Sequence, residues 1–284
     1  MPRTDGELWA REQLELLRGA RFAPRAVARF LAASQRRTSE QRRARPATAR
    51  RTRRWMAAGA AAWAALALAR REPFRRRIGA FVGWWALTWL MLDWHIGMVE
   101  TEDGRARNLG PADACTLVRV WLVPAVADEP APWMCALAFA SDALDGRLAR
   151  AGEPTRIGRD LEGLADWAFA AAALSGALRR GWLGRGAGSG ELVRLGAGLG
   201  YALVVYFGSA SAPDARVVHA ARLATPLRAG GLVAAGFGHR RAADALIAGG
   251  AAWSALAIAR ALVLVRRSAG TLEVQRPGGV DASR

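Results

Sequence analysis

Four acidic side chains in one short stretch, residues 141–166, are the groups of this chain best suited to chemistry. The stretch reads SDALDGRLARAGEPTRIGRDLEGLAD. Asp142 and Asp145 stand three residues apart, so a helix would place both carboxylates on one face. Glu162 and Asp166 stand four residues apart, with the same consequence for a second helix. We therefore expect two helices that each present a pair of carboxylates.

Two further features are expected around these acids: a turn between the helices and a bound cation. Gly152 and Pro154 lie between the two acidic pairs and predict a turn that folds the helices back against each other. Four carboxylates in largely apolar surroundings need a compensating cation, because an unpaired charge in a low dielectric is unfavourable. Such oxygen ligands suit Mg²⁺ or Mn²⁺, and two ions roughly 3.5–4 Å apart can clamp a diphosphate. The stretch therefore predicts a divalent-metal site for phosphoryl chemistry.

Small and basic residues accompany the acids. Gly146 and Ala149 lie on the acidic face of the first expected helix, and Gly158 and Gly163 flank the acids of the second. The absence of bulky groups there would let a phosphate reach the metals. Nearby guanidinium groups could neutralise the remaining phosphate charge, and they belong to Arg147, Arg150, Arg156 and Arg159. The alternative for any single acid is an ordinary ion pair on a helix surface.

The stretch resembles the motif of the CDP-alcohol phosphatidyltransferase family, D-x2-D-G-x2-A-R-x8-G-x3-D-x3-D. The residues that fit it are Asp142, Asp145, Gly146, Ala149, Arg150, Gly158 and Asp166. The motif is specific, because this many residue types at near-fixed spacing rarely coincide. The segment ADACTLVRVWLVP resembles the family's first-helix pattern through Thr116, Arg119 and Pro124, with Asp113 where Asn is usual. Together the two patterns cover residues 113–166.

Two departures from the motif concern the second helix. Glu162 stands where the family has its third aspartate, and seven residues instead of eight separate Arg150 from Gly158. Glutamate is longer by one methylene, so it could still bind a metal if the second helix lies slightly farther away. Asp160 is about 200° round a helix from Glu162 and should point away. These departures bear on the metal stoichiometry and on the activity itself.

The resemblance implies a reaction of phospholipid biosynthesis. A phosphatidyl group would pass from a CDP-linked lipid donor, such as CDP-diacylglycerol, to a small or lipid alcohol acceptor, with release of CMP. The resemblance also implies that Asp142, Asp145 and Glu162 hold Mg²⁺ or Mn²⁺, while Asp166 joins a metal site and acts as base on the acceptor hydroxyl. Implied nucleotide and diphosphate contacts are Gly146, Ala149, Arg150, Thr116 and Gly158. Weaker candidates for an acceptor phosphate are Arg156, Arg159, Arg216 and His219.

Composition indicates a membrane protein. Apolar residues form 52% of the chain, yet its mean hydropathy is only +0.06, so charged and apolar residues must be segregated. Fifteen arginines and five acidic residues lie within residues 1–54, which therefore carry ten of the seventeen net positive charges. Basic clusters that border apolar runs favour anionic lipid headgroups over nucleic acid, and no basic ladder interleaved with aromatic residues suggests a nucleic-acid partner.

The apolar runs predict an all-α, polytopic membrane helix bundle. Six runs from Cys115 to Val265 predict a six-helix core. Trp55–Ala69 and Ile78–Leu92 predict an extra hairpin before it, although the first of these runs could instead be re-entrant or interfacial. The expected domains are a basic cytoplasmic amphipathic extension (1–54), the apolar hairpin and a loop (55–112), the catalytic membrane domain (113–267) and a cytoplasmic tail (268–284).

This topology predicts a multi-pass protein of the cell membrane with its active site facing the cytoplasm. It also places Arg70–Arg77 outside, against the positive-inside tendency. Cys115 and Cys135 are expected to be free buried thiols. A homodimer is expected from the resemblance alone.

Two other functions stay open. An intramembrane prenyltransferase also binds a diphosphate through aspartates and Mg²⁺, but it usually needs two motifs far apart, whereas these acids lie within one short stretch. The other alternative is a non-catalytic membrane protein that retains the fold and has lost its chemistry through Glu162. The sequence does not identify the alcohol acceptor.

Overall fold

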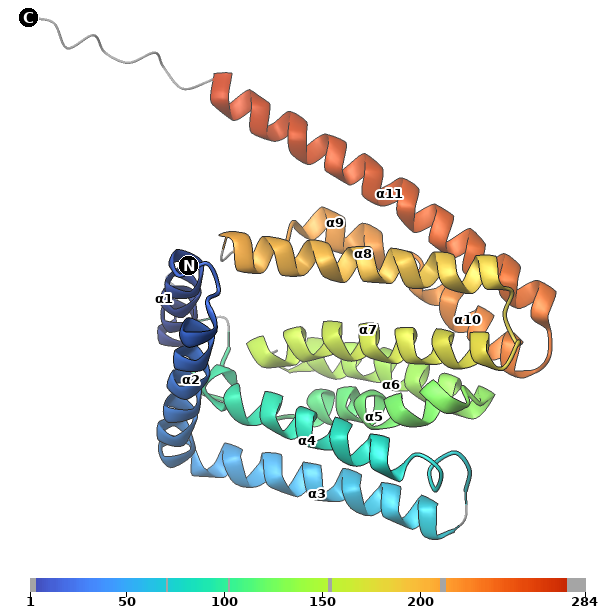
Figure 1. Cartoon of the computed structure of the whole chain (residues 1–284), viewed down its shortest axis with the longest axis horizontal. Coiled ribbons are helices and arrows are strands. Elements are labelled where there is room, and N and C mark those ends of the chain that lie inside the picture. Colours follow the sequence, from blue (N-terminus) through green and yellow to red (C-terminus); the bar gives the residue numbers. More distant parts are fainter. Residues whose placement is uncertain (1–3, 70, 102, 153–154, 210–212, 275–284) are drawn as a thin grey trace, which may run out of the picture.

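The structure is a computed structural model that describes residues 4–69, 71–101, 103–152, 155–209 and 213–274 (Figure 1). Its helices in chain order are α1 (Asp5–Gly19), α2 (Pro24–Ala44), α3 (Pro46–Leu68), α4 (Ile78–Trp94), the 3-10 helix η1 (Ile96–Met98), α5 (Pro111–Asp128), α6 (Pro132–Ala151), α7 (Arg156–Arg179), α8 (Arg185–Ser209), α9 (Ala215–Arg222), α10 (Thr225–Gly236) and α11 (Arg240–Val274). The described residues contain no strand, so the all-α prediction is confirmed.

The sequence sets where the helices around the acidic stretch begin. Proline occupies the first position of α5 and α6, as it does in α2 and α3, and proline suits this position because its fixed φ is already helical and its missing N–H is not needed. Thr155 caps α7, since its Oγ1 accepts a hydrogen bond of 3.1 Å from the backbone N–H of Gly158. The acidic stretch is thus divided between the end of α6 and the start of α7.

Each predicted apolar run lies in a helix of its own, and α3 to α8 are stacked side by side in the bundle (Figure 1). The centre is formed by α5 and α7, whose backbones approach closely at Gly176. A Cβ atom on Gly176 would lie 2.3 Å from the carbonyl oxygen of Val126, so no side chain fits there. Around this contact, Ala125, Ala173 and Leu174 are fully buried. The tight pairing holds α7, and therefore its acids, at a fixed position beside α5.

The N-terminal helices α1 and α2 lie crosswise over one end of the bundle, the end at which α6 finishes and α7 begins (Figure 1). The basic segment after Arg36 is helical and packs on the chain itself. Arg45 donates to the carbonyl oxygen of Val99 over 3.1 Å, and Arg51 donates to that of Leu109 over 2.7 Å. Part of the positive charge of residues 1–54 therefore anchors the extension to the loop that precedes α5.

The opposite end of the bundle holds an ion-pair cluster formed by Arg76, Arg77 and Asp128. Arg76 Nε and Arg77 Nη2 lie 2.9 Å and 2.6 Å from the carboxylate of Asp128, the last residue of α5. Two of the basic side chains in this segment therefore share one carboxylate of the chain. Because the positive-inside tendency counts Lys and Arg and is little affected by acidic residues, this pairing does not remove the conflict with that tendency.

By length and hydropathy, two helices of the described part could cross a membrane on their own, at Arg185–Gly208 and Arg240–Val263. The Trp55–Ala69 run belongs to α3, which is one continuous helix with no reversal inside it, and α3 packs against α4. Helix α11 continues to Val274, so the first part of the predicted tail is helical, and residues 275–284 lie outside the described residues. Pro154 of the predicted turn also lies outside them.

Candidate active site

Three of the four predicted acids converge at the junction of α6 and α7. Asp142 from α6 and Glu162 and Asp166 from α7 each offer a carboxylate oxygen, and these oxygens all lie within 4.8 Å of one another. The three side chains are partly accessible rather than sealed in the core. We refer to Asp142, Glu162 and Asp166 as the acid cluster. Glu162 therefore reaches the position at which the resemblance places an aspartate, despite its different length.

The fourth acid, Asp145, lies outside the acid cluster. It is 3% exposed, and its Oδ2 accepts hydrogen bonds from Arg119 Nη2 over 2.6 Å and from Thr116 Oγ1 over 3.0 Å. Both donors come from α5. The i,i+3 spacing does bring Asp145 to the same side of α6 as Asp142, but the side chain is directed to the buried arginine.

Arg119 is the centre of charge at this site. It is 2% exposed, and besides Asp145 its guanidinium lies 2.9 Å from Asp166 Oδ1 and 3.5 Å from Asp142 Oδ1. One guanidinium among four carboxylates leaves an excess of negative charge. Sequence reasoning quoted Arg119 as part of a helix pattern but did not predict it as a site residue. Arg119 could have been predicted as a site residue, because it lies inside an otherwise apolar run. A charged side chain there is unfavourable in a membrane unless it is paired.

The donor set of the acid cluster fits a divalent cation. Carboxylate oxygens are the ligands that Mg²⁺ and Mn²⁺ prefer, and the cluster holds three of them close together at partly exposed positions. The negative charge that Arg119 leaves uncompensated gives a physical reason for a cation there. Among the described residues, no other group of histidine, cysteine, aspartate and glutamate side chains has this spacing.

Two of the motif glycines have close neighbours, and the contact is tighter at Gly158 than at Gly146. A Cβ on Gly158 would lie 2.7 Å from Asp113 Oδ1, which belongs to the first turn of α5. A Cβ on Gly146 would lie 3.3 Å from Arg150 Nη1, so the Arg150 guanidinium folds back over the glycine. Gly163, in contrast, has nothing within 4 Å of its Cβ position. Asp113 also accepts a hydrogen bond of 2.7 Å from the N–H of Gly110 and so fixes the start of α5.

The candidates for an acceptor phosphate are divided by the structure. Arg156 is buried and directed to the N-terminal part of the chain: its N–H donates to the carbonyl oxygen of Glu100 over 3.0 Å, and its side chain pairs with Glu7. The other three candidates are exposed, and they are Arg159 at the start of α7 and Arg216 and His219 on α9. Arg222, also on α9, lies 3.9 Å from the Glu162 carboxylate and brings the basic side of this helix to the acid cluster.

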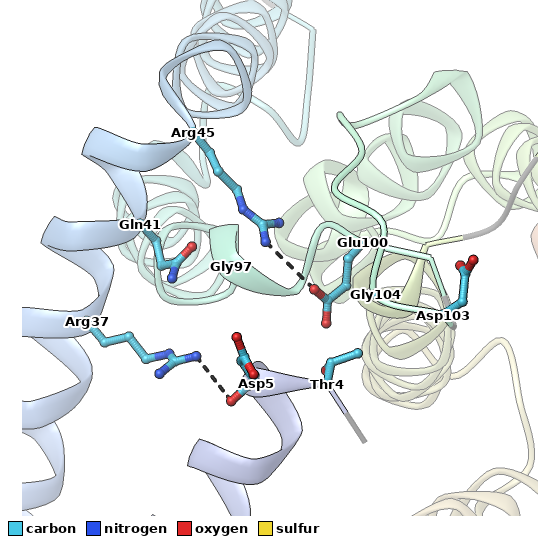
Figure 2. A pocket seen from close by; sticks show the side chains of 10 residues that line it. Thr4, Asp5, Arg37, Gln41, Arg45, Gly97, Glu100, Asp103 and Gly104 are labelled. Atoms are coloured by element: carbon cyan, nitrogen blue, oxygen red, sulfur yellow. Dashed lines mark hydrogen bonds and ion pairs between the residues drawn. The ribbon is translucent and has the colours of Figure 1, made fainter. Parts of the chain in front are cut away.

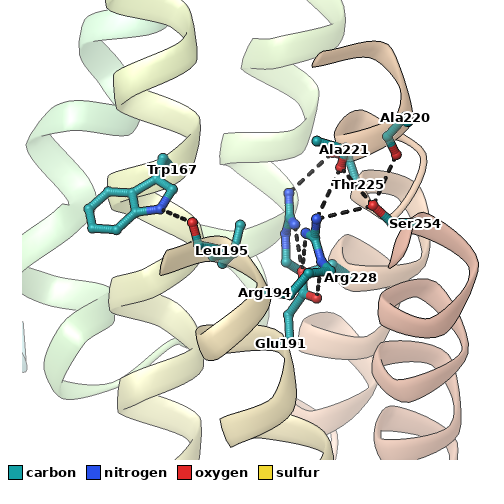
Figure 3. A network of polar contacts seen from close by, with 9 residues as sticks. All are labelled: Trp167, Glu191, Arg194, Leu195, Ala220, Ala221, Thr225, Arg228 and Ser254. Carbon is teal, nitrogen blue, oxygen red and sulfur yellow. Dashed lines mark hydrogen bonds and ion pairs between the residues drawn. The ribbon is translucent and has the colours of Figure 1, made fainter. Parts of the chain in front are cut away.

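A small groove of about 60 Å³ adjoins the acid cluster between α6, α7 and α10. Its polar wall includes Arg119, Asp142 and Asp166, and its apolar wall includes Phe139 and Phe169. Arg228 of α10 lines it as well. The Arg228 guanidinium lies 2.8 Å from the carboxylate of Glu191, a fully buried residue of α8 that also pairs with Arg194 (Figure 3). This buried network fixes Arg228 at the groove.

Comparison with known proteins identifies one family. The family model for CDP-alcohol phosphatidyltransferase matches residues 111–237, which run from the start of α5 to just after α10 and include the acid cluster and the groove. This is a family of phosphotransferase enzymes with a polytopic helical membrane fold, so the predicted membrane bundle is confirmed. No curated protein and no solved structure gives a significant match. Residues 111–237 of this chain therefore form a domain of the CDP-alcohol phosphatidyltransferase family, as the motif at residues 142–166 predicts.

Proposed function

We propose that this chain transfers a phosphatidyl group from a CDP-linked lipid, such as CDP-diacylglycerol, to an alcohol, with release of CMP. The convergence of three carboxylates from two consecutive helices, within 4.8 Å of one another, is the observation that supports this most. The family supplies the reaction class, CDP-alcohol phosphatidyl transfer. The groove beside the acid cluster supplies a reason for a lipid donor, because its apolar wall adjoins carboxylates.

The acid cluster would hold the predicted Mg²⁺ or Mn²⁺ through Asp142, Glu162 and Asp166. When bound, such an ion would offset the charge of the diphosphate and of the departing CMP. Asp145 has its Oδ2 bound to Arg119 and Thr116, and we propose it for a second ion next to the first. Its hydrogen bonds meanwhile keep Arg119 directed into the site, where the guanidinium balances part of the negative charge.

Asp166 is proposed as the base. It is 30% exposed and lies beside the groove, so a hydroxyl group can reach its carboxylate. An unactivated alcohol is a poor nucleophile at neutral pH. A carboxylate oxygen of Asp166 would accept the hydroxyl proton as the alcohol oxygen forms its bond to the phosphorus that carries the lipid. The bond from that phosphorus to the oxygen of CMP breaks, and CMP leaves with the bonding electrons.

Residues around the acid cluster are proposed to bind the substrates. Gly146, Ala149 and Arg150 at the end of α6 would border the nucleotide and diphosphate, and Gly158 would keep the start of α7 close enough to complete this border. Thr116 acts here through its hydrogen bond to Asp145. The exposed side chains of Arg159, Arg216 and His219 are proposed for a phosphate on the acceptor, together with Arg222, which already lies beside Glu162.

The proposed location in the cell follows from the distribution of basic residues along the chain. The basic N-terminal helices cover the end of the bundle at which α6 finishes and α7 begins, the two helices that carry the acid cluster (Figure 1), and basic segments remain on the cytoplasmic side of membranes. We therefore propose a multi-pass protein of the cell membrane whose active site faces the cytoplasm. The exposed arginines of residues 1–54 are proposed to contact anionic lipids. The homodimer stays a prediction from resemblance.

A CMP-release assay tests the proposed reaction. The purified full-length chain in lipid nanodiscs is incubated with CDP-diacylglycerol and Mg²⁺ or Mn²⁺. Separate reactions contain glycerol phosphate, inositol phosphate, serine or phosphatidylglycerol. We expect CMP release with one acceptor, loss of release after chelation by EDTA and recovery when the ion is restored. Asp142→Asn and Asp166→Asn should each reduce release by on the order of 1,000-fold, about 4 kcal/mol of lost transition-state stabilisation.

Two results would count against this function. Absence of CMP release with every alcohol and both ions, in a preparation whose helix content is intact, would favour a protein that retains the fold without the chemistry. Release that persists unchanged in Asp142→Asn would place the reaction elsewhere in the molecule. Exposed residues far from the acid cluster, such as Glu15 on α1, provide a control, because Glu15→Gln should leave CMP release unchanged.

A further inference from the structure

A second polar cavity lies outside the family domain. It has a volume of about 300 Å³ and is lined by the start of α1, by α2 with Arg45, and by Gly97, Glu100, Asp103 and Gly104 (Figure 2). None of the residues that line it belongs to the acid cluster or to the groove. Its charged lining residues are Asp5, Arg37, Arg45, Glu100 and Asp103.

Glu100 gives this cavity its chemical character. The residue is 5% exposed, and its Oε1 has no hydrogen-bond partner among the described residues, while its Oε2 lies 3.7 Å from Arg45 Nη2. Figure 2 shows the carboxylate directed into the cavity, between Arg45 and Thr4. A buried carboxylate oxygen without a donor is unfavourable by roughly 1–3 kcal/mol or more. The position therefore favours a bound group that donates a hydrogen bond to Oε1.

Two carboxylates of the lining are left for a ligand. Asp103 pairs with Arg105, a residue outside the lining, over 2.8 Å, whereas Asp5 and Glu100 line the cavity together with Arg37 and Arg45. Both guanidiniums already have protein partners. Arg37 donates to the carbonyl oxygen of Asp5 over 3.3 Å and stacks on Trp9 at 4.8 Å, and Arg45 donates to Val99 over 3.1 Å. The carboxylates of Glu100 and Asp5 are thus the groups that a ligand would meet.

The spacing of the acids favours an organic cation over a bare metal ion. Among the described residues, the acid cluster is the only group with metal-ligand spacing, so Asp5, Glu100 and Asp103 do not form one. Asp103 is also engaged, since hydrogen bonds from Thr101 and Arg105 lower the pKa of its carboxyl. The cavity volume is at the lower end of the range for small-molecule sites, roughly 300–1,000 Å³.

We propose that this cavity binds a small organic ion with a primary ammonium group, whose N–H donates to Glu100 Oε1 and whose charge is shared with Asp5. The site adjoins the start of α7. The carbonyl oxygen of Glu100 accepts from the N–H of Arg156 over 3.0 Å, and Glu7 pairs with the Arg156 side chain. An ammonium ion in the cavity would bridge Asp5 of α1 and Glu100, next to the helix that carries Glu162 and Asp166.

Isothermal titration calorimetry of the full-length chain tests this site. The protein is held in nanodiscs of uncharged lipid, so that the ammonium ion has no anionic headgroup to bind. The probe is 2-amino-1,3-propanediol, and its matched control is the N,N,N-trimethyl derivative, which has the same charge and hydroxyls but no N–H donor. We expect saturable binding of one equivalent of the primary amine and no saturable binding of the trimethyl derivative.

Three variants locate the binding. Glu100→Gln should weaken it by about tenfold or more, as expected for the loss of one charged hydrogen bond. Gly6→Leu should abolish it, because Gly6 lines the cavity and a Cβ there already lies 3.7 Å from Glu100 Oε1, so the larger side chain competes with a ligand for this space. Leucine favours helix more than glycine does, so α1 is kept. Asp103→Asn is the matched control and should change the affinity by less than about twofold, because this carboxylate already has hydrogen-bond donors of its own.

The proposal is overturned by any of three results. These are the absence of saturable binding of the amine to the folded wild-type chain, equal binding of the trimethyl derivative, or unchanged affinity in Glu100→Gln. If Glu100→Gln does not fold, Gly6→Leu decides, and full affinity in that variant would contradict the site. Helix content measured by circular dichroism establishes which variants are folded.

Discussion

Arg119 Nη2 donates to Asp145 Oδ2 over 2.6 Å, and both side chains are almost completely buried. This ion pair separates Asp145 from the acid cluster formed by Asp142, Glu162 and Asp166. The four acids of the motif are therefore not equivalent: three lie within 4.8 Å of one another, as ligands of one metal ion would, and the fourth pairs with the buried arginine.

The first prediction follows from this division and concerns metal binding. Asp142→Asn should weaken the tightest Mn²⁺ site by about tenfold or more, which corresponds to about 1.4 kcal/mol or more, because it removes a carboxylate of the acid cluster. Asp145→Asn should keep that site within about threefold, yet lower CMP release by on the order of 100-fold, since Arg119 loses a charged hydrogen-bond partner worth about 3 kcal/mol. Mn²⁺ titration followed by electron paramagnetic resonance measures the affinity.

The contrast between the two variants is the critical result. If Asp142→Asn and Asp145→Asn weaken the tight Mn²⁺ site equally, then the Asp145 carboxylate gives up its contact with Arg119 and itself binds the first ion. Glu12→Gln on the exposed face of α1 is the control and should leave the Mn²⁺ affinity unchanged.

The second prediction concerns the length of Glu162. Because the glutamate carboxylate already reaches the acid cluster, Glu162→Asp should withdraw it by about one methylene, roughly 1.5 Å, and weaken metal binding and CMP release by about tenfold. Glu162→Gln should weaken both further, because it removes the charge as well. Mg²⁺ dependence of CMP release gives the apparent affinity for each variant. If the Glu162→Asp variant is as active as the wild type, the extra methylene of glutamate is not needed to bring the carboxylate from α7 to the acid cluster.

The acid cluster could be predicted from the sequence because it depends on local periodicity. Spacings of three and four residues place Asp142 with Asp145 and Glu162 with Asp166 on common helix faces, and a single turn brings the two helices together. The same argument correctly excluded Asp160, which is exposed and lies outside the acid cluster. All of this information lies within residues 141–166.

Contacts between distant segments could not be predicted in the same way. The bond between Arg119 and Asp145 joins α5 to α6, and that between Arg156 and Glu7 joins α7 to α1. Periodicity shows which face of a helix a residue occupies, but not which helix packs against that face. For this reason Arg156 was assigned to a phosphate, whereas the structure directs it to the N-terminal extension. The extension itself was predicted as amphipathic helices, and its position across one end of the bundle depends on such pairings.

The third prediction compares two glycines on either side of Glu162. A Cβ at Gly158 would lie 2.7 Å from Asp113 Oδ1 and 2.9 Å from Thr155 Oγ1, whereas the Cβ position of Gly163 is open. Gly158→Ala should therefore displace the start of α7 and lower stability by about 1–3 kcal/mol. Gly163→Ala should be neutral or stabilising by up to about 1 kcal/mol, because alanine favours helix. Thermal unfolding of both variants in the same detergent checks the sign of each change.

CMP release provides a second measurement for these glycines. Gly158→Ala should lower it, since Glu162 and Asp166 move with α7, while Gly163→Ala should retain it. Equal tolerance of alanine at both positions would contradict the close contact between α7 and Asp113.

The fourth prediction concerns the cluster at the opposite end of the bundle. Asp128 is 11% exposed as a side chain and is contacted by the guanidiniums of Arg76 and Arg77, with Arg180 at 3.9 Å. Asp128→Asn leaves these guanidiniums without their shared carboxylate. Because the arginine side chains are 33–51% exposed and solvent screens their charges, a loss of only about 1 kcal/mol is expected. The melting temperature should fall by about 2–4 °C. Glu72→Gln is the control, because Glu72 is 49% exposed and its pair with Arg76 is 3.8 Å long, and it should shift melting by less than about 2 °C.

The fifth prediction concerns the attachment of α1 to the start of α7. Helix α1 contacts Arg156 through an ion pair from Glu7, whose side chain is 39% exposed. Glu7→Gln should therefore loosen α1 without unfolding the bundle, because its partner Arg156 keeps its backbone hydrogen bond to Glu100. Limited trypsin digestion should cut the Arg21 turn between α1 and α2 several times faster than in the wild type, since cleavage follows the population of the opened state.

Glu12→Gln provides the matched control for this digestion, since Glu12 is an exposed residue of the same helix and its substitution removes the same charge. Its cleavage rate at Arg21 should equal that of the wild type. A charge-reversed pair, Glu7→Arg with Arg156→Glu, should restore protection if the two side chains act through their mutual attraction. Unchanged protection in Glu7→Gln would mean that the other contacts of α1, among them those of Leu14 and Leu17 and those of Arg37 with Asp5 and Trp9, are enough to hold it. This ion pair would then not couple the N-terminal extension to the helix that carries Glu162 and Asp166.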